Sequence, residues 1–213
     1  MGAIMMQANE KTMVGTGKRL HSTNYIAKVA ILGAASWLVM LLEFPLAFIF
    51  PEFLKFDFSD IIPLIGSLAL GPVAGILIEL IKNLIHMLQT STSGVGELAN
   101  FIVGAAFVGV AGVYYKIHKT KKGALIGLLL GVVAMVVAGG IVNYFITIPL
   151  YSILLVPFDV IIGMSAKVIP AIHDRFTLIL YAFCPFNLLK GVVLALITWP
   201  IYKKLSPILH KGL

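Results

Sequence analysis

Long apolar stretches alternate with more polar or aromatic connections from residue 26 onward, and this pattern predicts membrane-embedded helices. The stretches cover residues 26–42, 60–70, 73–88, 97–115, 123–148 and 178–200. A helix needs about 20 apolar residues to cross the hydrocarbon core of a bilayer, a length that the longer stretches approach or exceed. The stretch 60–70 would be only about 16 Å long as a helix. We expect it to stay at membrane depth because protein covers its ends.

The dipeptide Gly71-Pro72 decides how many helices the pattern contains. Proline is tolerated at the start of a helix, where its missing N–H would be unpaired anyway, so a second helix can begin there. Counting two helices places three basic clusters on one side: the N-terminal tail, Lys116 to Lys122, and Lys203 to Lys211. Joining residues 60–70 and 73–88 into one helix would move the middle cluster to the opposite side. The positive-inside rule therefore favours six helices with both termini cytoplasmic.

Composition supports an all-α integral membrane protein folded as a compact six-helix bundle. The 213 residues are 60% hydrophobic and 12% charged, whereas soluble domains carry about 25% charged residues. The net charge of +7 collects at segment ends, which argues against nucleic-acid binding and for a cell-membrane location. One cysteine, Cys184, excludes an internal disulfide. We expect a flexible tail over 1–24, a membrane domain over 25–205 and a basic tail over 206–213.

The last apolar stretch carries an amide and a charge near its middle. Asn187 and Lys190 are three residues apart and therefore share one helix face. A lysine at the centre of a spanning helix costs about 2.5–3.5 kcal/mol on the insertion scale. Such a residue is kept when it faces a cavity, a ligand or a partner, so this face is predicted to be functional.

Further polar residues fall in the outer halves of three helices, where they would converge with this face. They are Glu97, Asn100 and Asn143. Amides offer a donor and an acceptor together, and an apolar pocket with a few placed polar groups is the usual small-molecule site. Capping of a nearby helix start is the alternative for Glu97 and Asn100. Aromatic contacts are expected from Tyr144, Tyr151, Tyr181 and Phe186.

Two other features have a structural and a functional interpretation. Glu79 and Lys82, three apart, are predicted to form an ion pair within one helix, or else to contact the ligand or Lys190. The connection over 43–59 is an interfacial aromatic belt or a lid over an apolar ligand. Its phenylalanines are Phe44, Phe48, Phe50, Phe53, Phe56 and Phe58.

The first helix carries a pair of small residues, Ala30 and Ala34, at four-residue spacing. Such a pair lets two helices approach closely, either inside the bundle or at a partner's helix. Enzyme signatures are poor, because the chain has no His-Glu-x-x-His sequence for zinc and its five histidines are scattered. A small intramembrane enzyme using Lys190 or Ser165 remains an alternative. ATP-driven transport would require another subunit, because the chain shows no ATP-binding motif.

The order of these features resembles the substrate-binding S components of energy-coupling factor (ECF) transporters, and most closely the riboflavin-specific RibU family. The resemblance covers about residues 26–205, and its specificity lies in the order and spacing of short motifs. These motifs are Ala30-x-x-x-Ala34, Phe56-Asp57-Phe58-Ser59-Asp60-Ile61-Ile62-Pro63, Gly71-Pro72-Val73-Ala74-Gly75 and Phe186-Asn187-Leu188-Leu189-Lys190-Gly191.

The resemblance implies a transport subunit without catalysis, catalytic cofactor or metal. The S component would capture riboflavin outside the cell and deliver it with a transmembrane coupling subunit and two ATPase subunits. Ala30 and Ala34 match the family's motif for contacting the coupling subunit. Asn187 and Lys190 match polar positions that line the flavin site in the family. We extend the expected ligand-binding set to Asn143, Asn100 and Glu97 from their depth and side, and to the aromatic residues Phe186, Phe58 and Phe44. Whether FMN or FAD also binds stays open, and an S component for thiamin, biotin or a pteridine is the nearer alternative.

Overall fold

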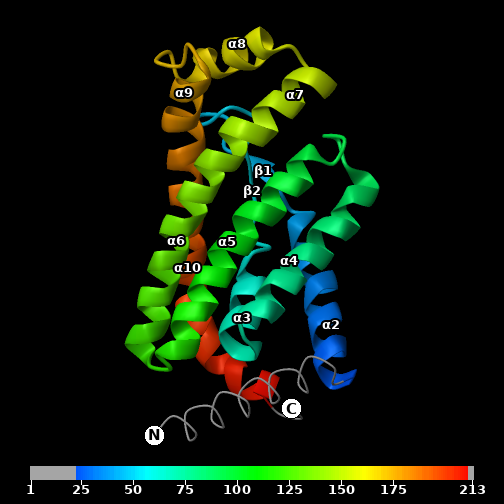
Figure 1. The fold of residues 1–213 in the computed structure, drawn as a ribbon, viewed down its shortest axis with the longest axis vertical. Coiled ribbons are helices and arrows are strands. Elements are labelled where there is room, and N and C mark those ends of the chain that lie inside the picture. Colours follow the sequence, from blue (N-terminus) through cyan, green and yellow to red (C-terminus); the bar gives the residue numbers. More distant parts are fainter. Residues whose placement is uncertain (1–22, 211–213) are drawn as a thin grey trace, which may run out of the picture.

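The computed structural model describes residues 23–210, which form a helical bundle with a small hairpin at one end (Figure 1). The α-helices are α2 (Thr23–Met40), α3 (Ile61–Leu70), α4 (Pro72–His86), α5 (Val95–Ile117), α6 (Lys121–Val142), α7 (Ile148–Leu154), α8 (Phe158–Val168), α9 (Arg175–Leu178) and α10 (Cys184–His210). Strands β1 (Phe44–Pro45) and β2 (Lys55–Phe56) pair antiparallel. The remaining elements are a 3-10 turn, η1 (Met87–Gln89), and two π-helical turns, η2 (Asn143–Thr147) and η3 (Ile179–Phe183).

Four helical segments among the described residues are long and apolar enough to cross a membrane. They are Thr23–Met40, Val95–Ile117, Lys121–Leu154 and Arg175–Tyr202. The outer face of α6 shows why lipid must surround the bundle. Leu129, Val133, Val137 and Ile141 follow one another along this face and are each more than half exposed. Such a continuous apolar surface is stable only against lipid or another apolar surface.

The predicted break at Gly71-Pro72 is present and turns the chain sharply between α3 and α4. Gly71 has a φ of 108°, a left-handed value that favours glycine, and its N–H still donates to the Ser67 carbonyl. Pro72 then opens α4, as proline does at a first helical position. α3 is only 10 residues long and is largely buried. The short apolar stretch is therefore an internal element that other helices cover.

Glycines at four-residue spacing on α6, Gly123, Gly127 and Gly131, form a packing surface for α5. A Cβ added at Gly127 would lie 2.8 Å from the Ala111 carbonyl oxygen, and one added at Gly131 would lie 2.8 Å from the Phe107 carbonyl oxygen. Real side chains do not fit at such distances, so glycine allows the two backbones to approach. These two helices form the most extensive helix pair of the bundle.

The connection between α2 and α3 covers the end of the bundle at which α7, α8 and α9 also lie (Figure 1). Phe44 pairs with Phe56 across the hairpin. Phe50 is buried, and its ring meets the ring of Phe186 in α10 edge to face, with 5.4 Å between centroids. At its far end the Ser59 carbonyl accepts a hydrogen bond of 2.9 Å from Ser36 in α2. The connection is thus an ordered cover rather than a loose loop.

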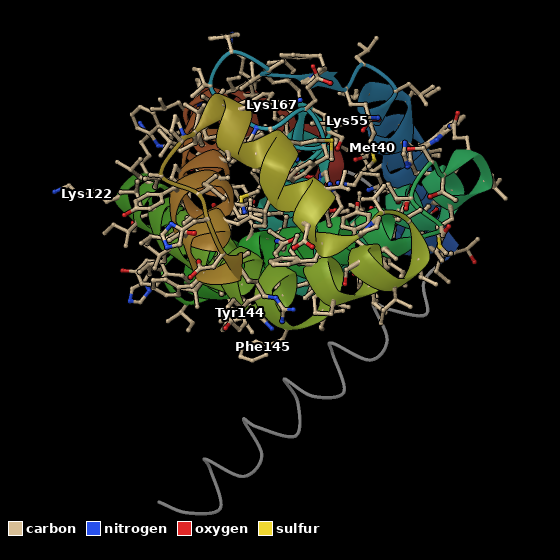
Figure 2. The ribbon with its side chains drawn as sticks, turned by 90° about the horizontal axis from the view of Figure 1, so that it is seen from above. Met40, Lys55, Lys122, Tyr144, Phe145 and Lys167 are labelled. Atoms are coloured by element: carbon tan, nitrogen blue, oxygen red, sulfur yellow. The ribbon has the colours of Figure 1, made fainter. Side chains whose placement is uncertain are left out.

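Residues 149–175, which we call the cap, are mostly helical. The helix that was predicted to end at Ile148 continues through η2 into α7, and α8 lies across the bundle when it is viewed from this end (Figure 2). Ile161 and Ile172 pack in one apolar core with Phe50 and Leu54 of the connection. The last helix extends to His210, so most of the expected C-terminal tail is helical. The rest of both expected tails, residues 1–22 and 211–213, lies outside the described residues.

Candidate functional site

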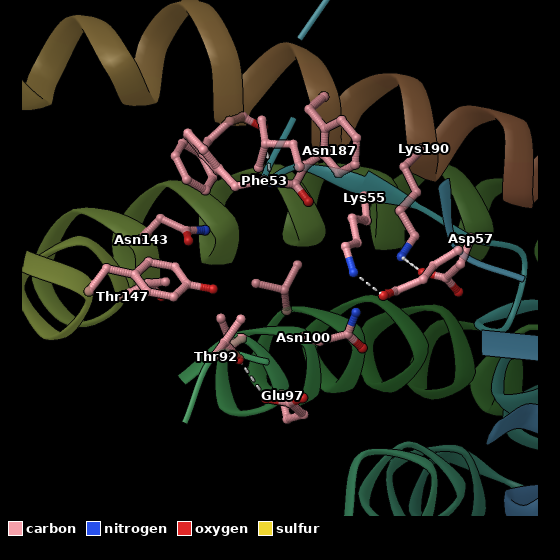
Figure 3. Close-up of a pocket in the computed structure, with 18 of the residues that line it drawn as sticks. Phe53, Lys55, Asp57, Thr92, Glu97, Asn100, Asn143, Thr147, Asn187 and Lys190 are labelled. Atoms are coloured by element: carbon pink, nitrogen blue, oxygen red, sulfur yellow. Dashed lines mark hydrogen bonds and ion pairs between the residues drawn. The ribbon is translucent and has the colours of Figure 1, made fainter. Parts of the chain in front are cut away.

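A cavity of about 520 Å³ lies between the connection, the cap and helices α5, α6, η2, α7 and α10. Its volume falls within the range of about 300–1,000 Å³ that is typical of small-molecule sites. Figure 3 shows the amides of Asn100, Asn143 and Asn187 directed toward this common space from three helices. Apolar side chains form much of the remaining wall, including Met40, Phe53, Leu54, Val103, Met135, Ile148, Ile161, Phe183 and Phe186.

Two of the amides are oriented in the same way by their own helices. Asn143 donates from Nδ2 to the Gly139 carbonyl oxygen at 2.7 Å, and Asn187 donates from Nδ2 to the Phe183 carbonyl oxygen at 2.9 Å. Neither amide oxygen is hydrogen-bonded within the described residues. The Oδ1 atom of Asn100 is buried and also lacks a partner among those residues. The cavity therefore presents acceptors, and the second N–H of each amide, to a ligand.

The position of Asn187 depends on a glycine in the neighbouring helix. A Cβ added at Gly139 of α6 would lie 2.5 Å from Nδ2 of Asn187. No side chain fits there, so α6 leaves room for the amide of α10 to lie against its backbone. This close approach of α6 and α10 allows Asn143 and Asn187 to line the same cavity.

Lys190 belongs to a buried network of charges at the inner end of the cavity. Its Nζ atom lies 2.8 Å from Asp57 Oδ2 and 3.2 Å from Asp60 Oδ2. Asp60 also pairs with Lys82, whose Nζ atom lies 2.7 Å from Glu79 Oε2. The side chains of all five residues are at most 4% exposed. The predicted Glu79–Lys82 pair is therefore present, and Asp60 joins it to Lys190.

The charges of this network do not balance. It contains three carboxylates and two ammonium groups, which gives one excess formal negative charge. Buried charges are tolerated only when they are paired and hydrogen-bonded. Asp57 is further held by hydrogen bonds from the backbone N–H, at 2.8 Å, and the hydroxyl of Ser59. Glu79 is the least satisfied member, because its Oε1 atom is buried without a hydrogen-bond partner among the described residues.

Glu97 organises the outer end of the cavity. Its carboxylate accepts hydrogen bonds from Thr90 at 2.9 Å and Thr92 at 2.8 Å, and His86 Nδ1 lies 3.0 Å from its other oxygen. These contacts tie the loop before α5 to the first turn of that helix. Glu97 lines the cavity but is only 4% exposed, so its main contacts are with the protein.

The candidate residues named from sequence fall into three groups. Asn187, Lys190, Asn143, Asn100, Glu97 and Phe186 all line the cavity. Phe44 and Phe58 are not among the lining residues; both rings pack on Phe56 and are 40% and 37% exposed. Ala30 and Ala34 are exposed on the outer face of α2, whereas Gly33 between them faces the bundle.

Sequence reasoning missed Asp57 and Asp60 as site residues. A lysine deep in an apolar helix requires a counter-charge, and the acidic residues just before α3 were the signal for it. Of the four expected aromatic residues, Tyr151 and Phe186 line the cavity. Tyr144 instead packs beneath Arg175, and Tyr181 is 44% exposed.

A partly polar cavity enclosed by an apolar, lipid-facing bundle defines a membrane-embedded protein that binds a small molecule. Comparison with known proteins places it more narrowly. Residues 24–202 match the family model described as "ECF transporter, substrate-specific component". The chain therefore belongs to the substrate-specific components of ECF transporters, which are transporter subunits rather than enzymes.

Individual relatives agree with this assignment. The chain is 31% identical to the riboflavin transporter RibU of Staphylococcus aureus, over 86% of this chain and 90% of the relative. It is 35% identical to the riboflavin transporter FmnP of Bacillus subtilis, over 84% and 90%. A solved structure described as the S component of a bacterial ECF transporter matches with a TM-score of 0.67 at 30% identity, over 88% of this chain and 98% of that chain.

Proposed function

We propose that this chain is the riboflavin-binding subunit of an ECF importer and that the cavity is the riboflavin site. The observation that carries the proposal is the set of three amides directed into one largely apolar cavity. A flavin combines a flat apolar ring system with an imide edge and a chain of hydroxyls. Amides offer donors and acceptors to such an edge, and the apolar wall suits the dimethylbenzene ring. The relatives named as riboflavin transporters support this choice of ligand.

Within the cavity, Asn187 and Lys190 are the proposed contacts for the polar edge of the ring. Both line the cavity from one face of α10. Lys190 is already paired with Asp57 and Asp60, so its role is that of a fixed hydrogen-bond donor rather than a free charge. Asn143, Asn100, Glu97 and Phe186 complete the proposed site. Phe44 and Phe58 belong to it only as part of the connection that covers the cavity.

We also propose six membrane crossings with both termini cytoplasmic. The start of α2, the α3–α4 turn, the α5–α6 turn and the end of α10 lie at one end of the bundle, opposite the hairpin and the cap (Figure 1). Lys116, Lys119, Lys121 and Lys122 lie at or beside the α5–α6 turn. Positive charge of this kind marks the cytoplasmic side, so the cavity would lie toward the outside.

The exposed pair Ala30 and Ala34 is the proposed contact for the transmembrane coupling subunit. Both face away from the bundle on α2, which favours docking of a partner over internal packing. Small residues on an exposed helix face let a partner helix approach closely. Two ATPase subunits would act through that coupling subunit.

The test is the absorbance spectrum of the detergent-purified protein, followed by denaturation and mass analysis of what is released. Flavin bands with the mass of riboflavin are the expected result. The apo protein should then quench the fluorescence of added riboflavin. A colourless protein that does not quench riboflavin fluorescence would reject riboflavin. Binding of thiamin, biotin or a pteridine in the same protein would then identify an S component for another vitamin.

A further inference from the structure

The π turn η2 changes which side of the following helix faces the cavity. The N–H of Ile148 donates to the carbonyl of Asn143, five residues earlier, rather than to a carbonyl four residues earlier. Such a turn accommodates one extra residue. In Figure 2 Phe145, within this turn, points away from the bundle, and it is 69% exposed. The extra residue of the turn therefore lies on the lipid-facing side of the helix.

An uninterrupted α-helix would present different residues to the cavity. An α-helix advances about 100° per residue, so residues seven and eleven positions after Asn143 would share its face. Those residues are Leu150 and Leu154. One extra residue in the turn moves the face on by one position, to Tyr151 and Leu155. The structure follows the second pattern, because Tyr151 and Leu155 line the cavity.

Leu150 and Leu154 line a different hollow. They face a groove formed by Leu84, Met87, Leu98 and Phe101 on α4, η1 and α5. The π turn therefore exchanges two leucines for a tyrosine and a leucine in the cavity wall. It turns a purely apolar position into one that carries a hydroxyl group.

Tyr151 lies where that hydroxyl group has polar neighbours. A Cβ added at Gly96 would lie 3.1 Å from the Tyr151 hydroxyl oxygen, so the phenol packs against the first turn of α5. Thr92 and Glu97, which are hydrogen-bonded to each other at 2.8 Å, line the same outer end of the cavity. Figure 1 shows α7 leaning toward the loop that precedes α5.

We propose that Tyr151 is a ligand-binding residue that closes the outer end of the cavity, and that the π turn at Asn143–Thr147 positions it there. The inference rests on the proposed riboflavin site. The hydroxyl of Tyr151 contacts the hydroxylated chain of the flavin. The groups around this hydroxyl are polar, whereas the apolar part of the cavity wall offers a surface for the ring system.

Affinity measurements test the contact. Tyr151→Phe should weaken riboflavin binding about 3- to 10-fold, the loss expected for one hydrogen bond. It should leave unchanged the affinity for lumiflavin, which has the ring system without the hydroxylated chain. Leu150→Ala is the matched control and should leave the riboflavin affinity within about 2-fold, because Leu150 faces the groove. An unchanged riboflavin affinity in Tyr151→Phe would overturn the contact. Failure of the unsubstituted protein to bind either flavin would instead overturn the proposed function.

Cysteine labelling tests the register without relying on affinity. Single cysteines at positions 150, 151, 154 and 155, placed in a Cys184→Ala background, are labelled with a small maleimide with and without saturating riboflavin. Bound ligand should slow labelling at positions 151 and 155 and leave 150 and 154 unaffected. Slowing at 150 and 154 instead would show an uninterrupted α-helix and overturn the role of the π turn.

Deletion of Ile146 is a second test of the same register. It removes the extra residue, so a continuous α-helix would still bring Tyr151 to the cavity face. The deletion should keep riboflavin affinity within about 3-fold, and Tyr151→Phe should still weaken it in that background. Insertion of one alanine after Ile146 should instead turn Tyr151 away and remove its effect. A folded deletion variant that no longer responds to Tyr151→Phe would contradict the proposal.

Discussion

Lys190 in α10 and Asp57 in the connection before α3 form an ion pair with 2.8 Å between Nζ and Oδ2, although 133 residues separate them in the chain. The pair joins the cover of the cavity to its wall. Lys190 also contacts Asp60, and through it the Lys82–Glu79 pair. Changes to the two partners of this ion pair should therefore have unequal effects, because the network contains three acidic groups and only two basic ones.

Lys190→Met should destabilise the protein more than Asp57→Asn. The first change leaves three carboxylates with one ammonium group, whereas the second leaves two of each. Breaking a buried ion pair by removing one partner costs about 3–5 kcal/mol, and we expect the lysine variant to lose that much. The measurement is thermal or denaturant unfolding in detergent. A larger loss in Asp57→Asn would contradict this account of the charge balance.

Glu79→Gln should be tolerated far better than Lys82→Met. The glutamine removes the excess negative charge and keeps the shape of the side chain, so the free energy of unfolding should fall by no more than about 1 kcal/mol, or rise. Lys82→Met removes the ammonium group that Glu79 and Asp60 share and should cost about 3–5 kcal/mol. Neither residue lines the cavity. Equal losses in the two variants would show that the five charges do not act as one network.

Gly104→Ala should disturb the same network from α5. A Cβ at position 104 would lie 2.7 Å from Glu79 Oε2, which forces the carboxylate or the helix to move. Overpacking of this kind costs about 1–3 kcal/mol. Gly109→Ala on the same helix is the control, because its Cβ would lie 3.4 Å from the nearest side-chain atom of Ile76. Higher helix propensity should make that change neutral or stabilising by up to about 1 kcal/mol.

Asn187→Ala should weaken riboflavin binding by about 1–3 kcal/mol, because polar atoms of the ligand would be left unpaired. Asn83→Ala is a closely matched control. Asn83 is buried and makes the same kind of bond, from Nδ2 to the Glu79 carbonyl oxygen at 2.9 Å, but it lies outside the cavity. It should lower stability and leave riboflavin affinity unchanged. Fluorescence titration of both variants checks the prediction, and equal affinities would remove Asn187 from the site.

Substitutions at two adjacent positions of α2 should distinguish an effect on assembly from an effect on folding. Ala34→Phe adds a large side chain on the exposed face and should block assembly with the coupling subunit while sparing riboflavin binding. Gly33→Ala should instead lower the thermal stability and leave assembly intact, because its Cβ would lie 2.5 Å from Ile81 Cγ2 inside the bundle. Co-purification with the coupling subunit and thermal unfolding are the two measurements. Loss of riboflavin binding in Ala34→Phe would assign Ala34 to internal packing.

The membrane helices and the depth of Lys190 could be predicted from sequence, because both depend on runs of apolar residues. The partners of Lys190 could not, because no local pattern links residue 57 to residue 190. The π turns were missed for a related reason: an apolar stretch such as 123–148 looks the same with or without one extra residue per turn. Nor does the composition of the connection show which of six phenylalanines turn inward, since Phe50 and Phe56 are buried and Phe44 and Phe58 are not.

The ion pair across 133 residues also sets an order for the protein's biosynthesis. A chain is made from its N-terminus, so Asp57, Asp60 and Glu79 enter the membrane with Lys82 as the only cation of their network. These three acidic groups have one basic partner among them until the last helix brings Lys190. The inner end of the binding cavity is therefore completed only when the final transmembrane segment has been inserted, and a nascent chain that stops short of α10 has no finished site to offer its ligand.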